Sequence, residues 1–261
     1  GKGVYICEEN KEAELAIKEI FEGKFGNAEN LLIEEFLKGE EMSYFIITDG
    51  KTIKKFDTAQ DHKNSMVVPC DVCDYQAVVS AFSSIVDRWG YIDVLFNNAG
   101  LAKPSQTIDN LSVEDWSEVV NVNLNGSFFC AKVAFTVMRN QSPQGGRIIN
   151  NGSVSSYVPR PGSAPYTSTK HAVTGLTRSI SLDGRPYNIV CGQIDIGNAL
   201  TPMAHQMTIG VPQADGTVKA EATMDPANVS KTLLHMAELP LEANVQLVTV
   251  MASTMPYIGR G

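Results

Sequence analysis

The residues with the clearest chemical potential are Tyr166 and Lys170, four positions apart in APYTSTKHAVTGLTRSISL, a segment with helical periodicity. Side chains four positions apart on a helix share one face and lie about 5–6 Å from each other. An ammonium group beside a phenol favours the phenolate and lowers the tyrosine pKa from about 10 towards neutrality. A tyrosine in that state can give a proton to an alcohol oxygen or take one from it.

Ser153 ends the preceding predicted strand, thirteen residues before Tyr166, and can donate a hydrogen bond to the same substrate oxygen. No side chain transfers a hydride, so this chemistry requires a redox cofactor. The Y-x-x-x-K spacing alone is common on helix surfaces, where it has no function. Combined with NNAG at 97–100 and NVNLNG at 121–126, it indicates an active site.

Strand and helix signals alternate after residue 64, and no hairpin turns separate them. The predicted strands are MVVPCDV (66–72), YIDVLFNNAG (91–100), GRIINNGSV (146–154) and NIVCGQIDIG (188–197). The predicted helices span 75–90, 110–138 with Ser112 as the N-cap of an S-x-x-D arrangement, and 164–182. This alternation predicts an α/β fold with a doubly wound parallel sheet. The ligand crevice of such a sheet lies beyond the carboxyl ends of the strands, where NNAG, GSV and GQIDIG converge.

Composition excludes several classes of function. The 261 residues are 43% hydrophobic, which supports a sizeable core, and carry a net charge of −8. The acidic balance argues against a nucleic-acid partner, because no basic face is available to neutralise phosphates. No apolar run is long enough for a membrane span, and the N-terminal residues do not read as a secretory signal. We therefore expect a cytoplasmic protein.

The cysteines predict no metal site. Cys70 and Cys73 form a C-x-x-C pair, but no second pair or histidine cluster accompanies them. A redox or metal role for this pair is the less favoured alternative. We interpret the five cysteines as small side chains of a reduced protein.

The composition changes abruptly near residue 63. Residues 1–63 contain 23 charged residues, all the basic ones being lysine, whereas residues 64–261 contain 27. All seven arginines and all twelve prolines follow residue 63. This difference predicts two segments of different origin, 1–63 and 64–261.

Residues 64–261 resemble the short-chain dehydrogenase/reductase family through CDV (70–72), NNAG, NVNLNG, the strand ending at Ser153, and YTSTK (166–170). The resemblance implies a Rossmann-like sheet and an NAD- or NADP-dependent oxidoreductase that interconverts an alcohol and a ketone. It further implies a catalytic tetrad of Asn123, Ser153, Tyr166 and Lys170. In that tetrad Tyr166 is the acid/base, Ser153 orients the substrate oxygen, and Asn123 holds a water. Lys170 binds the nicotinamide ribose and lowers the tyrosine pKa.

The same resemblance implies the cofactor contacts and a homodimer or homotetramer. Besides Tyr166 and Lys170, the implied cofactor-binding residues are Asp71, Val72, Asn97, Ala99, Gly100, Gly197 and Thr201. Asp71 and Val72 would contact adenine. Ile196-Gly197 departs from the Pro-Gly that the family has after this strand, but Gly197 and Thr201 still fit contacts to the carboxamide.

The family's glycine-rich TGxxxGxG turn is absent from this sequence. Gly23 and Gly26 form only G-x-x-G, which we interpret as a surface turn. Glycines in that turn let the backbone approach the pyrophosphate at a helix N-terminus. The sequence therefore predicts a truncated sheet that has lost its first βαβ unit together with half of the cofactor cradle. It also leaves open a catalytically inactive chimera.

Residues 1–63 resemble a fragment of the ATP-grasp ligase glycinamide ribonucleotide synthetase, through GKGV (1–4), KFGNAEN (24–30), IEEFLKGEE (33–41), TDGKT (48–52) and AQDHK (59–63). A strand is predicted at GVYIC, a helix at 11–21, and two strands at 30–37 and 41–50 that a KGE turn joins. The resemblance implies a small α+β fragment in which Glu41 reaches the ATP ribose and Lys2 lies near the phosphate loop. A phosphoribosylamine–glycine ligase fragment is therefore the alternative function. The resemblance ends before that family's magnesium ligands.

Overall fold

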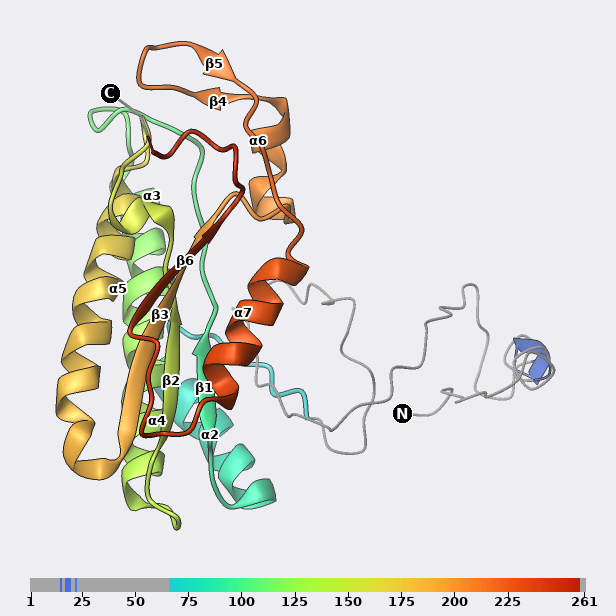
Figure 1. The fold of residues 1–261 in the computed structure, drawn as a ribbon, viewed down its shortest axis with the longest axis vertical. Helices are drawn as coiled ribbons and strands as arrows, with labels where there is room; N and C mark the ends of the chain where they lie inside the picture. The colour runs from blue at the N-terminus through green and yellow to red at the C-terminus, as the bar shows by residue number, and fades with distance from the viewer. Residues whose placement is uncertain (1–14, 16, 20–21, 23–65, 259–261) are drawn as a thin grey trace. The chain divides into compact units, whose positions relative to one another are not determined.

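The computed structural model describes residues 15, 17–19, 22 and 66–258 of the chain (Figure 1). Residues 15 and 17–19 are helical, inside the helix predicted over 11–21. The strands predicted at GVYIC, 30–37 and 41–50, the KGE turn, the G-x-x-G turn, Lys2 and Glu41 lie outside the described residues. Residues 67–258 belong to one compact unit.

The sheet of this unit has four parallel strands in the order β1-β2-β3-β6, which confirms the predicted parallel α/β sheet. The strands are β1 (Val94–Asn97), β2 (Gly146–Asn151), β3 (Ile189–Gly197) and β6 (Leu247–Met251). Their register places Asn97 opposite Asn150, and Asn150 opposite Gln193. A row of amide side chains therefore crosses the three strands, at the carboxyl ends of β1 and β2 and in the middle of β3.

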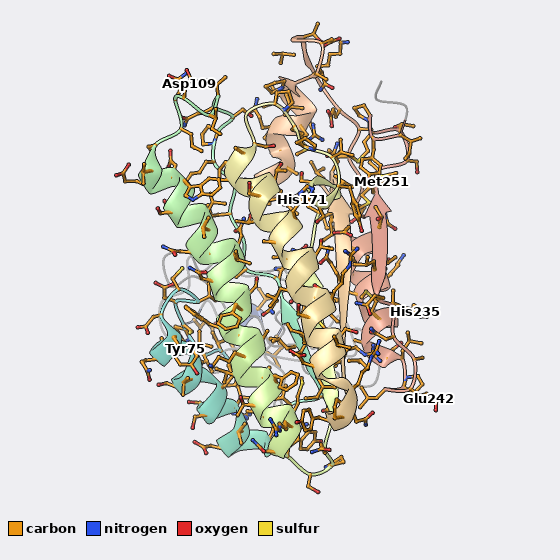
Figure 2. All side chains as sticks on the ribbon, turned by 90° about the vertical axis from the view of Figure 1, so that its left-hand side faces the viewer. Tyr75, Asp109, His171, His235, Glu242 and Met251 are labelled. Carbon is orange, nitrogen blue, oxygen red and sulfur yellow. The ribbon has the colours of Figure 1, made fainter. Side chains whose placement is uncertain are left out.

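Helices cover both faces of the sheet (Figure 1). One face carries α4 (Ser127–Asn140) and α5 (Ala164–Asp183), and α2 (Tyr75–Trp89) packs beside α4. Figure 2 shows the α4 and α5 helices side by side in front of the strands. The other face carries α7 (Ala227–Glu238), where Met236 packs with Ile149 and Ile194 in an apolar core. Burying each of these three side chains contributes about 1.5–3 kcal/mol.

The predicted helix over 110–138 contains a change of helix type. Ser112 caps α3 (Val113–Val120) by accepting the Asp115 N–H, as its S-x-x-D pattern predicts. A π-helical segment, Asn121–Gly126, then joins α3 to α4. Such segments are rare and are often found at functional sites. This one contains NVNLNG.

The strand predicted over 66–72 is wrong. Residues 66–69 have no strand conformation, and Val67 is 80% exposed. Pro69 has no N–H to donate to a neighbouring strand, which disfavours a paired strand there. The strand predicted over 91–100 is also shorter, because only Val94–Asn97 pairs with β2.

An irregular segment follows β3. It contains the short 3-10 turn Pro202–Ala204, α6 (His205–Ile209), and the antiparallel pair β4 (Val211–Pro212) and β5 (Val218–Lys219). Two other 3-10 turns, Val154–Ser156 and Arg185–Tyr187, flank α5. No helix in the described part of the chain has the length and apolarity to cross a membrane.

Candidate active site

Asn123 in the π-helical segment joins the loop after β1 to helix α5. Its side chain is 1% exposed. Its Oδ1 accepts the Leu101 N–H at 2.8 Å, and its Nδ2 donates to the Leu101 carbonyl at 2.9 Å and to Thr169 Oγ1 at 3.3 Å. This amide therefore fixes the loop that follows NNAG against the helix that carries Tyr166.

Ser153 lies just after β2, at the N-cap of the 3-10 turn Val154–Ser156. Its Oγ accepts the Ser155 N–H at 3.1 Å, so the hydroxyl proton stays available for another acceptor. Its own N–H donates to Asp195 Oδ1 at 2.9 Å. Because Ser153 is only 5% exposed, its orientation is set by these contacts.

Tyr166 and Lys170 lie one turn apart near the start of α5, as predicted. Pro165 in the first turn suits the helix start, where no N–H is needed. Lys170 is 4% exposed, and its Nζ donates to the Asn151 carbonyl at 2.7 Å. The same Nζ lies 5.4 Å from the centroid of the half-buried Tyr166 ring. A buried cation therefore stands beside the phenol.

The four predicted catalytic residues lie around the carboxyl ends of β1 and β2. A Cβ built on Gly100 would lie 3.5 Å from Asn123 Oδ1 and 4.0 Å from Lys170 Nζ, which places these groups together. Ser156 Oγ lies 3.2 Å from the Lys170 carbonyl oxygen, which places the Ser153 turn next to α5.

The predicted cofactor residues fall into two groups. Gly100, with Ala99 beside it, is half-buried and borders Asn123 and Lys170. Gly197 is packed so closely that a Cβ would lie 2.7 Å from Met251 Cβ, whereas Thr201 is exposed. These residues fit the nicotinamide end of a dinucleotide.

The surroundings of Asp71 and Val72, which the resemblance assigns to adenine, are more open. Asp71 is exposed and its carboxylate accepts the Cys73 N–H at 2.9 Å, while Val72 is buried against Gly126. The cavity there has about 10 Å³, room for one water, and is lined by Val72, Leu95, Phe96, Asn97, Asn98, Ala99, Gly126, Ser127 and Cys130. The described residues therefore supply part of a floor here and no enclosure for adenine or pyrophosphate.

Asn97 has a structural place in this arrangement. Its Nδ2 donates to the Ser127 carbonyl at 3.1 Å and to Asn150 Oδ1 at 2.8 Å. Both donor positions are thus used within the protein, so the Asn97 side chain ties β1 to β2 and α4.

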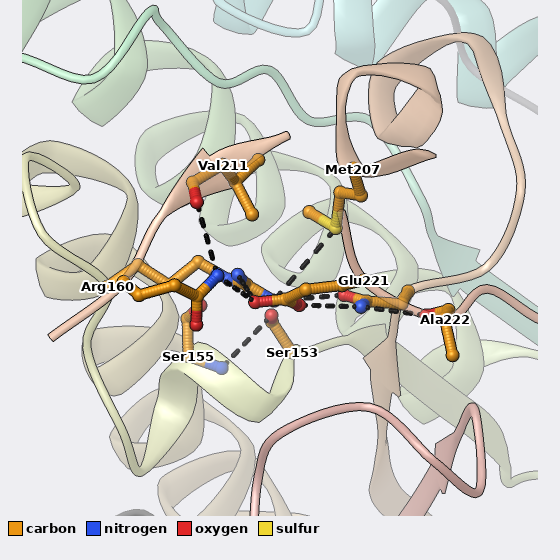
Figure 3. A network of polar contacts seen from close by, with 9 residues as sticks. Ser153, Ser155, Arg160, Met207, Val211, Glu221 and Ala222 are labelled. Carbon is orange, nitrogen blue, oxygen red and sulfur yellow. Dashed lines mark hydrogen bonds and ion pairs between the residues drawn. The ribbon is translucent and has the colours of Figure 1, made fainter. Parts of the chain in front are cut away.

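Sequence reasoning missed a buried ion pair above the site. The Glu221 side chain, 1% exposed, accepts from Arg160 Nη1 at 2.7 Å and from Nη2 at 2.6 Å. Asn198 Nδ2 and Gln213 Nε2 also donate to it, each at 2.9 Å. Figure 3 shows this network between the loop after Ser153 and the segment after β3. The pair holds these two segments together.

Burial alone would raise the pKa of Glu221. The hydrogen bonds from Arg160, Gln213 and Asn198, with the Arg160 charge, outweigh burial and lower this pKa to about 2. Glu221 is therefore ionised throughout the neutral range.

Sequence reasoning also missed the buried polar residues of β3, Gln193 and Asp195, each 0% exposed. The signal was present in NIVCGQIDIG, where polar side chains occupy alternate positions of an otherwise apolar strand. Period-two alternation places both on one face of the sheet.

Three of the cysteines, Cys70, Cys130 and Cys191, are buried. Burial raises the pKa of Cys130 and of Cys191 to about 12, which makes both thiols unreactive. Within the described residues, no group of three or more histidine, cysteine or acidic side chains is arranged to bind a metal ion.

Comparison with protein families gives a match on each part of the chain. The family described as "short chain dehydrogenase" matches residues 43–210. The family described as "Phosphoribosylglycinamide synthetase, ATP-grasp (A) domain" matches residues 1–68. These matches confirm both resemblances, and their overlap over 43–68 contains the boundary predicted at 63/64.

Individual relatives are dehydrogenases. A 3beta-hydroxysteroid dehydrogenase of Mediterraneibacter gnavus is 34% identical over 152 residues, 58% of this chain and 54% of that protein. A trans-4-hydroxycyclohexanecarboxylate dehydrogenase of Sinomonas cyclohexanicum is 30% identical over 80% of this chain and 76% of that protein. The chain thus spans about half the length of the first relative and three quarters of the second.

Solved structures share the fold. The 3-ketoacyl-(acyl-carrier-protein) reductase from Brucella melitensis, complexed with NADH, matches with a TM-score of 0.64 and 19% identity. The match covers 74% of this chain and 79% of that one. Because the family match covers well over half of the sequence and falls on the residues that build this site, the chain belongs to the short-chain dehydrogenase family, a family of oxidoreductases.

Proposed function

We propose that residues 64–261 form an oxidoreductase domain that interconverts an alcohol and a ketone with NAD or NADP, with Tyr166 as the acid/base. The observation that carries this proposal is the buried Lys170 ammonium, held by the Asn151 carbonyl, 5.4 Å from the Tyr166 ring centroid. The Tyr166 hydroxyl, on the same helix face as this cation, can take the proton of an alcohol and return it to a ketone.

Ser153 supplies a second hydrogen bond to the substrate oxygen. Its Oγ already accepts the Ser155 N–H, so its hydroxyl proton can be donated to the substrate oxygen. Asn123 keeps the loop after β1 and the Tyr166 helix at a fixed separation. Together these contacts hold the proton donor and the orienting hydroxyl in place before substrate arrives.

The cofactor, when bound, supplies or accepts the hydride. Gly100, Lys170, Gly197 and Thr201 would hold its nicotinamide half, and Asp71 and Val72 would lie at the adenine. The sequence has no GxxxGxG turn for the pyrophosphate. We therefore expect weaker cofactor binding than a complete cradle would give.

The named relatives suggest substrates to test, a 3β-hydroxysteroid and trans-4-hydroxycyclohexanecarboxylate. A cytoplasmic location and a homodimer or homotetramer remain predictions from sequence. The match to the ATP-grasp domain falls largely on residues outside the described ones, so no site geometry supports a ligase.

The test is a fluorescence titration of the full chain with NADH and with NADPH, followed by turnover assays with the two candidate substrates. We expect saturable binding of one cofactor, and Tyr166→Phe should preserve binding while lowering turnover roughly 10²- to 10⁴-fold. Tyr91→Phe, which alters an exposed tyrosine, is the matched control and should change neither. Absence of binding for both cofactors would contradict the proposal and favour the inactive chimera, and so would full turnover in Tyr166→Phe.

A further inference from the structure

Asp195, on β3 beneath the site, collects the donors of the Ser153 turn. Its Oδ1 accepts the Ser153 N–H at 2.9 Å, the Ser156 hydroxyl at 3.1 Å and Gln193 Nε2 at 2.7 Å. Three donors from two segments therefore converge on one carboxylate oxygen. Gly152 allows this approach, because a Cβ at that position would overlap Asp195 Oδ1.

The second oxygen of this carboxylate has no hydrogen bond. Asp195 is 0% exposed, its Oδ2 is buried without a partner, and it forms no ion pair with any described residue. Burying a carboxyl oxygen without a hydrogen-bond partner is costly. Burial, followed by the nearby Asp195 side chain, raises the pKa of Tyr157. A well-packed apolar side chain would avoid this cost, so the carboxylate calls for a role other than stability.

The Asp195 carboxylate is held by Gln193, whose amide is in turn held by helix α5. Gln193 donates to Thr174 Oγ1 at 2.9 Å and accepts from Thr177 Oγ1 at 3.0 Å, so its amide cannot rotate without losing partners. Both threonines belong to α5.

The contacts continue across the sheet. Asn150 donates to Thr177 Oγ1 at 2.9 Å and accepts from Asn97 at 2.8 Å. Asn97 donates to the Ser127 carbonyl, and Ser127 Oγ donates to the Asn123 carbonyl at 2.9 Å. We call this chain of contacts the polar row; its side chains are those of Asn97, Ser127, Asn150, Thr177, Gln193 and Asp195. It connects Ser153 to Asn123 through the interior of the fold.

We propose that Asp195 is a positioning residue for Ser153. Its Oδ1 holds the Ser153 amide and the Ser156 hydroxyl, and through them sets the direction of Ser153 Oγ. The polar row supplies the rigid backing, and Gln193 is the member that orients the carboxylate. This inference rests on the proposed role of Ser153 towards substrate.

The chemistry explains why a carboxylate stands here. A carboxylate oxygen accepts several hydrogen bonds and donates none, which suits three converging donors. An asparagine would place an N–H₂ group where Oδ2 now lies, and it would hold the Ser153 amide less strongly because its oxygen is uncharged.

The first readout needs neither cofactor nor substrate. In the full chain with ¹⁵N-labelled serine, the Ser153 amide is assigned by comparison with Ser153→Ala, and its exchange with solvent deuterium is followed. Asp195→Asn should move this amide resonance upfield and lower its protection about 10-fold, because the acceptor of the Ser153 hydrogen bond becomes a weaker one. The control is Arg147→Met, a buried arginine whose guanidinium donates to the segment after α7, which should leave the Ser153 resonance in place.

The second readout is turnover. Asp195→Asn should lower kcat by roughly 10-fold or more while KM for the nicotinamide cofactor stays within twofold, since displacement of a reacting group affects the chemical step. Arg147→Met should lose thermal stability and keep kcat. A merely structural role for Asp195 predicts the reverse, a loss of stability with an unchanged kcat.

An unchanged Ser153 amide in Asp195→Asn overturns the proposal, whatever the activity. If the parent shows no turnover, the proposed function fails while the amide readout still decides the role of Asp195. Should Asp195→Asn not fold, Gln193→Met answers the same question, because it removes the donor that orients the carboxylate. It should move the same resonance in the same direction by a smaller amount, and no movement counts against the proposal.

Discussion

Two buried carboxylates of this protein, Glu221 and Asp195, differ in how their charge is compensated. Glu221 meets the forked Arg160 guanidinium and two amides, so both of its oxygens have donors. Asp195 has three donors on one oxygen and none on the other. The comparison teaches that burial alone does not reveal a role: the first group ties two segments together, and the second holds a serine.

The largest expected effect comes from removing the cation of the compensated pair. Arg160→Leu leaves the Glu221 carboxylate buried without a cation, and we expect it to lower the free energy of unfolding by about 3–5 kcal/mol. Urea unfolding of the full chain measures this loss. The double variant Arg160→Leu/Glu221→Leu should recover most of the stability, since an apolar pair of similar volume is often neutral. A double variant no more stable than the single one would show that the ion pair is not the cause.

The second-largest effect on stability is expected when acid protonates Glu221. Its folded pKa of about 2 is depressed below the ordinary value of 4.5, so ionisation stabilises the folded state above pH 4.5. This contribution, up to about 3 kcal/mol, should be lost progressively as the pH falls from about 4.5 to about 2. Comparing the pH dependence of unfolding in the parent and Glu221→Gln isolates it. Equal slopes for the two proteins in this window would contradict the assignment.

Asp195→Asn should have a smaller effect on stability. It weakens the bond to the Ser153 amide but removes an uncompensated buried charge, so we expect a change of about 1 kcal/mol or less. The same urea experiment checks this. A loss as large as that of Arg160→Leu would mean that Asp195 serves the fold and would remove the contrast between the two carboxylates.

The smallest effect is expected at the surface. Lys103 Nζ lies 2.6 Å from Glu118 and 3.0 Å from Asp115, and the hydrogen bonds that it donates to these two carboxylates raise the pKa of Lys103. Water and salt screen such pairs. Lys103→Met should leave the unfolding midpoint indistinguishable from that of the parent. A clear shift of the unfolding midpoint would show that the Lys103 ion pairs stabilise the fold as the buried Arg160–Glu221 pair does, and would contradict this prediction.

Much of the fold could be predicted from local sequence signals. The alternation of apolar strands with capped helices gives the parallel sheet, and Ser112 behaves as the N-cap that its pattern indicates. The motif spacing also placed Ser153, Tyr166 and Lys170 around one strand end. Their catalytic roles stay predictions. The strand predicted over 66–72 was wrong, because its apolar residues favour a strand but Pro69 has no N–H to donate to a neighbouring one.

The remaining features depend on contacts between distant residues. Arg160 and Glu221 are 61 positions apart, and no periodicity relates them. The π-helical segment differs from the flanking α-helices in its i→i+5 hydrogen bonds, and no residue of NVNLNG marks that change in the sequence. Asp195 could have been found, because a polar residue at alternate positions of a buried strand requires partners.

The polar row also has a consequence for how α5 can move. Apolar side chains tolerate sliding, because a methyl group finds similar neighbours after a small displacement. The Thr177 hydroxyl instead has fixed partners on β2 and β3, and a slide of one helical turn, about 5.4 Å, would separate them. Tyr166 and Lys170 lie on the same helix as Thr177, so the polar row also fixes their position along the direction of the strands. We expect a variant with only apolar side chains between α5 and the sheet to fold, but to hold Tyr166 at several positions along the strand direction.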